Sequence, residues 1–100
     1  MSTTQNPTAK AWPDGVVARY VTVGGATVDI TDDRHRDYIG ATCTGERCGW
    51  QERTCLEGMT YDTSEETQAR FERWLPTSQR GAQEHAERCR AVPRPEAAGR

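Results

Sequence analysis

The chain has 100 residues, of which 34% are hydrophobic, and its formal net charge is −2 at pH 7. This length allows one domain, and a core built from so few apolar residues is marginal without a metal or disulfides. The near-neutral charge excludes the overall positive field that is typical of nucleic-acid-binding proteins, and no apolar run is long enough to span a bilayer.

Composition divides the chain into two predicted tails and one predicted domain. Residues 1–11 are rich in small polar side chains and residues 92–100 contain two prolines, so we expect both segments to be disordered. Residues 12–91 form the predicted domain. Because no signal peptide opens the chain, the sequence predicts a cytoplasmic protein with no membrane contact. In that compartment cysteines are metal ligands or free thiols more often than disulfides.

The first predicted element is a β-hairpin over residues 16–31. Two runs rich in β-branched residues flank the pair Gly24-Gly25, which is a signal for a two-residue turn. This turn sets Val21 opposite Val28. One buried face is then expected to carry six side chains, namely Val17, Val21, Val23, Ala26, Val28 and Ile30. Arg19 interrupts that face, so we expect it near the edge of the sheet.

The second predicted element is a zinc-knuckle hairpin over residues 38–54. A strand leads into the turn from Cys43 to Cys48, and a further strand leaves it. A glycine-containing turn flanked by two cysteines points its backbone N–H groups at the sulfurs, which favours thiolates.

The C-terminal third of the chain predicts helix. Thr63 and Glu66 match the pattern of a capping box at a helix N-terminus. Pro76 ends or kinks the helix, so the segments 64–75 and 78–91 form either two helices or one kinked helix. The expected fold is therefore α+β, a small antiparallel sheet of two hairpins packed with a C-terminal helical segment.

Four residues form the predicted metal site. On a helix, His85 and Cys89 lie one turn apart on the same face, which suits two ligands of one metal. Together with Cys43 and Cys48 they give three sulfurs and one nitrogen, a closed ligand set for structural Zn²⁺. Cys55 is an alternative ligand, in an all-cysteine zinc or iron–sulfur site. The favoured interpretation of Cys55 is a buried free thiol.

This ligand pattern predicts that the chain is not an enzyme. A catalytic zinc keeps one position open for water, whereas four protein ligands are available here. The 36 residues between Cys48 and His85 also exclude the compact finger, which needs about a dozen. We therefore expect no catalytic residues and no small-molecule substrate.

Three segments carry a resemblance to a known group: residues 19–29, the turn over residues 43–48, and residues 82–93. They resemble small, functionally uncharacterised actinobacterial proteins of the Cys/His zinc-binding, zinc-finger-like type, which are often associated with phages or mobile elements. The resemblance implies zinc binding through Cys43, Cys48, His85 and Cys89. This chain departs from that pattern in its four-residue spacing between the first two cysteines, where two residues are commoner. The group has no established activity that could be transferred.

The favoured function is a non-catalytic interaction module stabilised by structural zinc, with nucleic acid as one candidate partner in a regulatory or mobile-element setting. Residues 70–100 carry seven arginines and four glutamates, a net charge of +3. Five of these arginines are the candidate contacts: Arg70, Arg73, Arg80, Arg88 and Arg90. Glutamates are interleaved with them, which equally fits an ordinary solvated helix face.

Two alternative functions remain open. One is a protein–protein adaptor or inhibitor that uses the acidic region 46–66 or exposed aromatic side chains such as Trp12, Trp50 and Tyr61. The other is a redox or iron–sulfur sensor, which would contain a metal other than zinc.

Overall fold

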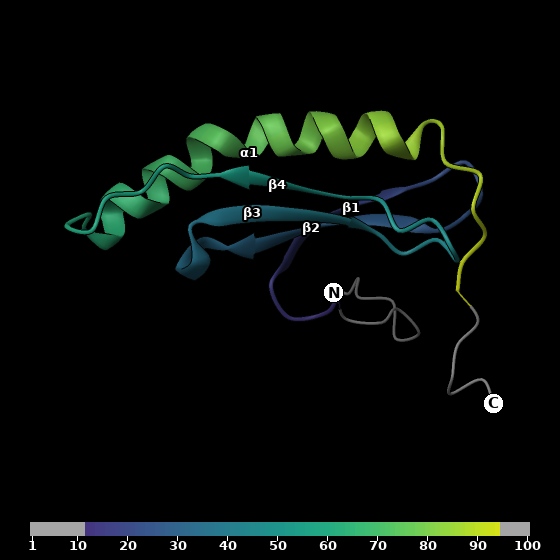
Figure 1. Cartoon of the computed structure of the whole chain (residues 1–100), viewed down its shortest axis with the longest axis horizontal. Coiled ribbons are helices and arrows are strands. Elements are labelled where there is room, and N and C mark those ends of the chain that lie inside the picture. Colours follow the sequence, from purple (N-terminus) through teal and green to yellow (C-terminus); the bar gives the residue numbers. More distant parts are fainter. Residues whose placement is uncertain (1–11, 95–100) are drawn as a thin grey trace, which may run out of the picture.

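A four-stranded antiparallel sheet and one long helix make up the fold, as predicted (Figure 1). The computed structural model describes residues 12–94, so residues 1–11 and 95–100 of the two predicted tails lie outside the described residues. The strands lie in the order β1-β2-β3-β4. The elements are β1 (Val16–Val21), β2 (Thr27–Asp33), a short 3₁₀ helix (Arg34–Arg36), β3 (Tyr38–Cys43), β4 (Gln51–Cys55) and α1 (Ser64–Ala86). The helix α1 does not have the combination of length and apolarity that a membrane crossing requires.

The first predicted hairpin is present, but its predicted register is wrong. Val21 pairs with Thr27 instead of Val28. The connection is a three-residue loop, closed by the amide N–H of Thr22, which donates to the carbonyl of Ala26 at 2.8 Å. A shift of one residue turns a strand over. The valines that the first half of the hairpin was expected to bury are therefore exposed, namely Val17 and Val21 in β1 and Val23 in the loop after it.

The core lies between α1 and one face of the sheet. It is small and consists mainly of side chains from the two central strands, the residue after β4 and the helix, namely Val28, Ile30, Ile39, Ala41, Leu56, Phe71, Ala82 and Ala86. The other face of the sheet has no helix over it within residues 12–94. Arg19 lies on that other face, in the edge strand β1, and forms an ion pair with Asp29 at 2.8 Å. Its predicted place near the sheet edge is confirmed.

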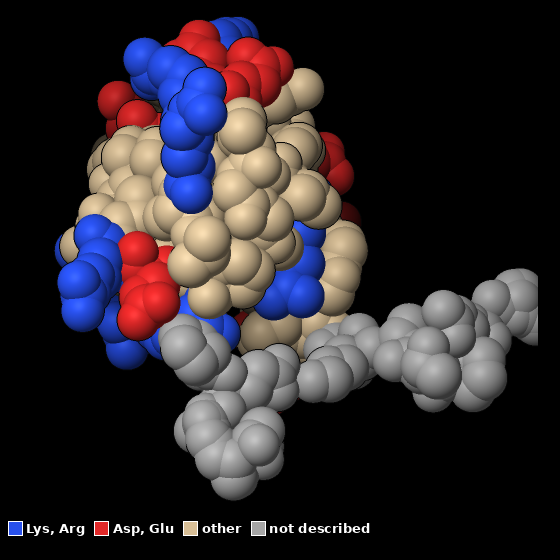
Figure 2. Space-filling model, turned by 90° about the vertical axis from the view of Figure 1, so that its right-hand side faces the viewer, with Lys and Arg blue, Asp and Glu red and all other residues tan. Residues whose placement is uncertain are grey.

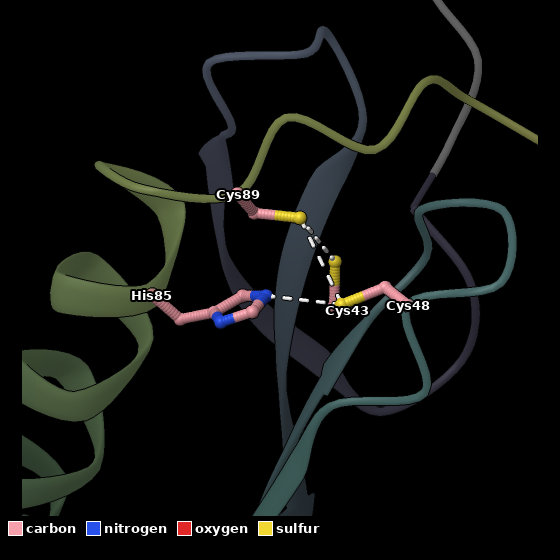
Figure 3. A group of neighbouring side chains, drawn as sticks. All are labelled: Cys43, Cys48, His85 and Cys89. Carbon is pink, nitrogen blue, oxygen red and sulfur yellow. Dashed lines mark hydrogen bonds between the residues drawn. The ribbon is translucent and has the colours of Figure 1, made fainter.

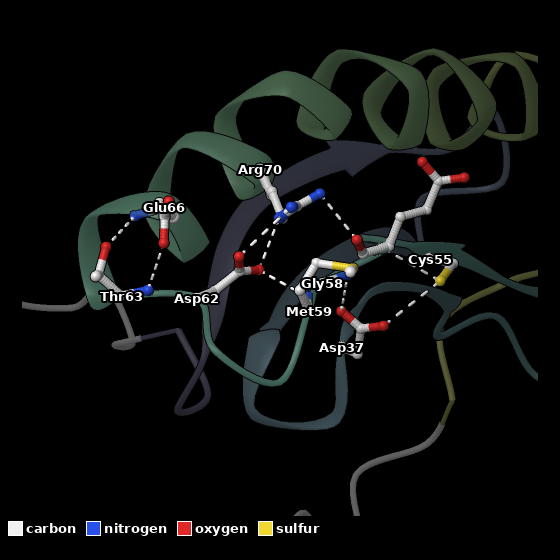
Figure 4. Close-up of polar contacts among 9 residues, drawn as sticks. Asp37, Cys55, Gly58, Met59, Asp62, Thr63, Glu66 and Arg70 are labelled. Carbon is white, nitrogen blue, oxygen red and sulfur yellow. Dashed lines mark hydrogen bonds and ion pairs between the residues drawn. The ribbon is translucent and has the colours of Figure 1, made fainter.

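The N-terminus of α1 has the predicted capping box. The hydroxyl of Thr63 accepts from the amide N–H of Glu66 at 3.1 Å, and the carboxylate of Glu66 accepts from the amide N–H of Thr63 at 2.7 Å (Figure 4). Pro76 lies inside α1, so the single continuous helix is the correct alternative and the two separate helices are not formed.

The C-terminal end of α1 differs from the prediction. The helix ends at Ala86 and does not continue to residue 91. The loop between β1 and β2 gives the physical reason, because it takes the carbonyl of Ala86, which in a longer helix would accept from the N–H of Arg90, and it binds the segment that follows. The amide N–H of Val23 donates to the carbonyl of Ala86, and that of Gly24 donates to the carbonyl of Cys89, both at 3.0 Å.

Candidate metal centre

The turn between β3 and β4 positions two of the cysteines. Cys43 is the last residue of β3, and its amide N–H donates to the carbonyl of Trp50 at 3.0 Å. Cys48 lies in the turn that this bond closes, two residues before Trp50. The amide N–H of Gly45 donates to the sulfur of Cys43 at 3.3 Å, and the backbone N–H of Trp50 is directed at the sulfur of Cys48. These N–H groups stabilise negative charge on both sulfurs, as the sequence predicts for a knuckle.

The end of α1 and the segment after it position the other two residues. His85 lies in the last turn of α1, whereas Cys89 lies outside the helix, so the prediction of two ligands on one helix face is wrong for Cys89. One further helix-like bond, from the amide N–H of Cys89 to the carbonyl of His85 at 2.9 Å, still keeps the two residues one turn apart.

The chain beyond Cys89 closes over the turn of the knuckle. The amide N–H of Glu46 donates to the carbonyl of Val92 at 2.8 Å, and Pro93 forms an isolated β-bridge with Gly45. Val92 and Pro93, which the sequence analysis assigns to the C-terminal tail, therefore lie against the metal centre. They hold the segment that carries Cys89 in place.

The four predicted ligands lie together and can hold one metal ion. The sulfurs of Cys43, Cys48 and Cys89 and a ring nitrogen of His85 all lie within 4.8 Å of one another (Figure 3). The sulfur of Cys89 lies 3.8 Å from that of Cys43 and 3.7 Å from that of Cys48. A tetrahedral metal with sulfur bonds of about 2.3 Å requires sulfurs about 3.8 Å apart. The Nε2 atom of His85 lies 3.3 Å from the sulfur of Cys48.

An aromatic ring shields one side of the centre. The indole of Trp50 stacks on the imidazole of His85 with ring centroids 4.5 Å apart and an angle of 9° between the planes. This contact fixes the orientation of the imidazole and removes water from one face. Burial accordingly lowers the pKa of His85, which favours the neutral form that binds metals.

The surroundings of the two knuckle sulfurs shift their pKa values in opposite directions. Burial raises the pKa of the Cys43 thiol to about 11. The backbone N–H of Trp50 lowers the pKa of the Cys48 thiol, which is only half-buried. Cys48 is therefore the sulfur that an incoming metal finds more readily as a thiolate, and Cys43 loses its proton when the metal binds.

Metal binding is expected to release protons. Because the Cys43 thiol keeps its proton up to a pKa of about 11, binding of Zn²⁺ at pH 7 must displace at least that proton. Protons compete with the metal, so its affinity is expected to fall by about tenfold per pH unit for each displaced proton as the pH falls. Calorimetric titrations with Zn²⁺ in buffers of different ionisation enthalpy count these protons. A count of zero at pH 7 would contradict this assignment.

Cys55 does not join the cluster. It lies at the far end of β4 and is exposed, so the prediction of a buried thiol is wrong. Its sulfur accepts from the amide N–H of Glu57 at 3.3 Å and lies 3.6 Å from the carboxylate of Asp37 (Figure 4). The structure therefore brings together the favoured four ligands and leaves out the alternative one. The second histidine of the chain, His35, is exposed beside Asp33 and does not join the cluster either.

The five arginines that were predicted as nucleic-acid contacts are spread along α1 and beyond its end. Arg70 is engaged in an ion pair with Asp62 at 2.8 Å and donates to the carbonyl of Glu57 (Figure 4). The others are exposed, namely Arg73, Arg80, Arg88 and Arg90. In a view onto the end of the molecule that holds the metal centre, acidic and basic side chains alternate around an uncharged area (Figure 2). They form no continuous basic surface there.

Sequence reasoning missed residues that support the centre without binding the metal. They are Trp50, which stacks on His85, and Gly24, whose backbone contacts the segment that carries Cys89. An aromatic residue two positions after a cysteine of a knuckle is a usable signal for the first. Nothing in the local sequence indicates the second, because its contact joins residues far apart in the chain.

The comparisons with known proteins give no family for this chain. No family model, no curated protein and no solved structure matches it. The resemblance to the actinobacterial group stays a prediction. The functional conclusion rests on the geometry of the four candidate ligands.

Proposed function

We propose that this chain is a non-catalytic interaction module whose fold is stabilised by a structural zinc ion. The observation that carries this proposal is the convergence of three sulfurs and one imidazole nitrogen from the knuckle and the end of α1. Zinc suits this ligand set because it accepts sulfur and nitrogen in a tetrahedral arrangement. Hard cations such as Mg²⁺ and Ca²⁺ require oxygen ligands instead.

Four protein ligands support a structural role for the metal. A hydrolytic zinc needs a position for water or substrate, and three thiolates reduce its ability to polarise either one. The ligands come from two parts of the chain, with Cys43 and Cys48 on one side and His85 and Cys89 on the other. A metal bound here joins the C-terminal end of α1 to the sheet, which is the usual role of zinc in a chain with a small core.

A protein partner has better support than nucleic acid. Of the candidate basic contacts, Arg70 is engaged with Asp62, and exposed glutamates such as Glu84 and Glu87 lie among the others. Nucleic-acid binding depends on a basic surface that neutralises several phosphates at once. We therefore place the adaptor or inhibitor function ahead of the nucleic-acid function. Of the aromatic side chains considered for a protein partner, Tyr61 is 91% exposed, whereas Trp50 stacks on His85 at the candidate metal centre.

Metal analysis of variants tests this proposal. The purified protein is expected to contain one zinc per chain and no visible absorbance from a cluster, even after anaerobic purification. His85→Ala is expected to lower the zinc affinity by at least about tenfold, because it removes one of four ligands. Cys55→Ala is the matched control and is expected to retain full zinc content. Loss of zinc in Cys55→Ala together with its full retention in His85→Ala would show that the ligand set is wrong.

A further inference from the structure

The outer edge of β4 carries backbone groups that have no strand beside them. Within residues 12–94, β4 is an edge strand that pairs with β3 alone. Cys43 and Trp50 share a backbone hydrogen bond, as do Asp37 and Leu56 on the other end of the ladder. Because the bonds of an antiparallel ladder alternate, Glu52 and Thr54 direct their backbone groups to β3. The other three residues direct theirs outward, namely Gln51, Arg53 and Cys55.

The outward backbone groups of β4 are available for a further strand. None of the backbone hydrogen bonds outside the ladder and the helix uses the N–H or carbonyl of Gln51, Arg53 or Cys55 within residues 12–94. An exposed edge of this kind pairs readily with an extended segment of another chain.

A groove between this edge and α1 gives the added segment a place for its side chains. The groove has a volume of about 490 Å³. Trp74 is half-buried and forms an apolar wall of the groove. Because Gly81 has no Cβ atom, the side chain of Glu52 lies against the helix at this position, where an added Cβ atom would stand 3.2 Å from the Cδ atom of Glu52. Thr77, Arg80 and Glu84 complete the helical wall.

The charges in the groove favour a basic occupant. Three carboxylates line it, those of Glu52, Glu57 and Glu84, and none of them forms an ion pair within residues 12–94. Arg80 offsets one of these charges. Arg53 also borders the groove, but its guanidinium lies over the ring of Tyr38, 4.7 Å from the centroid, on the other face of the sheet.

We propose that β4 and α1 together bind an extended, lysine- or arginine-bearing segment of a protein partner, which pairs with β4 as a fifth strand. A basic side chain of that segment lies along Trp74 and places its charged group between Glu52 and Glu84. The proposal rests on the interaction module proposed above and names the chemistry of its partner. Main-chain bonds to β4 supply affinity, and the carboxylates supply the preference for positive charge.

A second copy of this chain fits the same edge poorly. Antiparallel pairing of two β4 strands about their centre sets Arg53 opposite Arg53 or Glu52 opposite Glu52. Like charges directly opposite each other in a sheet are destabilising. A register with Thr54 opposite Thr54 avoids these pairs but sets Leu56 opposite Glu52, so a second β4 brings no basic side chain to the carboxylates of the groove in any of the three registers.

A labelled peptide that alternates valine and lysine tests the proposal on the zinc-loaded full chain. Its lysines all lie on one side of an extended strand. Fluorescence anisotropy at low salt is expected to show binding at least about tenfold tighter than for the matched peptide that alternates valine and glutamate. A lysine peptide with a central proline is expected to lose binding, because proline removes a donor from the added strand. No binding of the lysine peptide at about 1 mM, or equal binding of the two charged peptides, would overturn the proposal.

Variants of the groove separate strand pairing from simple attraction of charge. Arg53→Pro removes an outward N–H without removing a bond to β3, and it is expected to abolish binding. Arg53→Ala keeps that N–H and removes a positive charge beside the groove, so it is expected to bind the lysine peptide at least as tightly as the wild-type chain. Glu52→Gln with Glu84→Gln is expected to weaken binding by about tenfold, and Glu65→Gln, at the exposed start of α1, is the matched control. Unchanged binding in the double variant overturns the proposal even where Arg53→Pro does not fold.

Two parallel measurements distinguish the possible failures. Zinc content is measured for every variant. A chain that contains zinc but binds none of the peptides would contradict only the proposed peptide binding. A chain without zinc contradicts the proposed function instead. Sedimentation of the free chain tests whether a second copy of the chain occupies the edge of β4. A wild-type dimer that dissociates in Arg53→Pro would show that it does and would overturn the proposal.

Discussion

Removal of the metal by a strong chelator is expected to lower the melting temperature of the chain by about 16 to 32 °C. A ligand present at about 1,000 times its Kd stabilises the folded state by about 4 kcal/mol. Each kcal/mol shifts the melting temperature of a domain of this size by about 4–8 °C. The effect is large because the core is small and because the metal joins His85 and Cys89 to the knuckle. Without it, a few backbone bonds and apolar contacts hold the end of α1.

Thermal unfolding followed by circular dichroism, with metal content measured in the same samples, checks this expectation. The fluorescence of Trp50 is expected to change as well, because its ring stacks on a ligand. Re-addition of Zn²⁺ should restore the melting temperature, whereas Mg²⁺ serves as the control and should not, since it requires oxygen ligands. Full loss of metal with a melting temperature unchanged within a few degrees would rule out a structural role for the site.

Gly24→Ala is expected to destabilise the fold by about 1–3 kcal/mol and to weaken metal binding at the same time. A Cβ atom at Gly24 would lie 2.5 Å from the carbonyl carbon of Arg90 and would also overlap the carbonyl oxygens of Arg90 and Ala91. These are backbone atoms, so no side-chain rotation relieves the contact. The segment must move away, which breaks the bond from Gly24 to Cys89 and displaces a ligand.

Gly40→Ala in β3 is the matched control for this variant. Its added Cβ atom would meet the ring of Tyr38 at 3.7 Å, an ordinary contact, so stability is expected to change by less than about 1 kcal/mol. Denaturant unfolding and a competition assay for zinc compare the two variants. Equal stability and equal zinc affinity of Gly24→Ala and Gly40→Ala would show that the close approach at Gly24 has no consequence.

The sequence predicts the elements that depend on neighbouring residues. The capping box of Thr63 and Glu66 and the knuckle between Cys43 and Cys48 are local patterns, and both are present. Four ligands could be selected because their donor types and spacings agree with a known coordination chemistry. Cys55 could not be ruled out on spacing, because its exclusion depends on the length and direction of β4.

Two errors of the sequence analysis, the register of the first hairpin and the end of α1, have a common physical origin. Gly24-Gly25 indicated a two-residue turn, but only Gly25 has a backbone angle that favours glycine, with φ at 95°. Gly24 is needed for the close approach of the segment after α1. The same contact takes the carbonyl of Ala86 and ends the helix there. Both errors arise from one tertiary interface between residues more than sixty positions apart, which local propensity does not contain.

The order of the strands in the sheet determines which loop closures cost the most conformational entropy during folding. Each strand pairs with its neighbour in sequence, so forming the sheet closes only short loops, and short loops cost little entropy to close. The loop closure that costs more entropy brings the end of α1 to the knuckle, because 36 residues separate Cys48 from His85. A metal ion bound by the four candidate ligands would therefore stabilise the contact whose formation costs the chain the most conformational entropy.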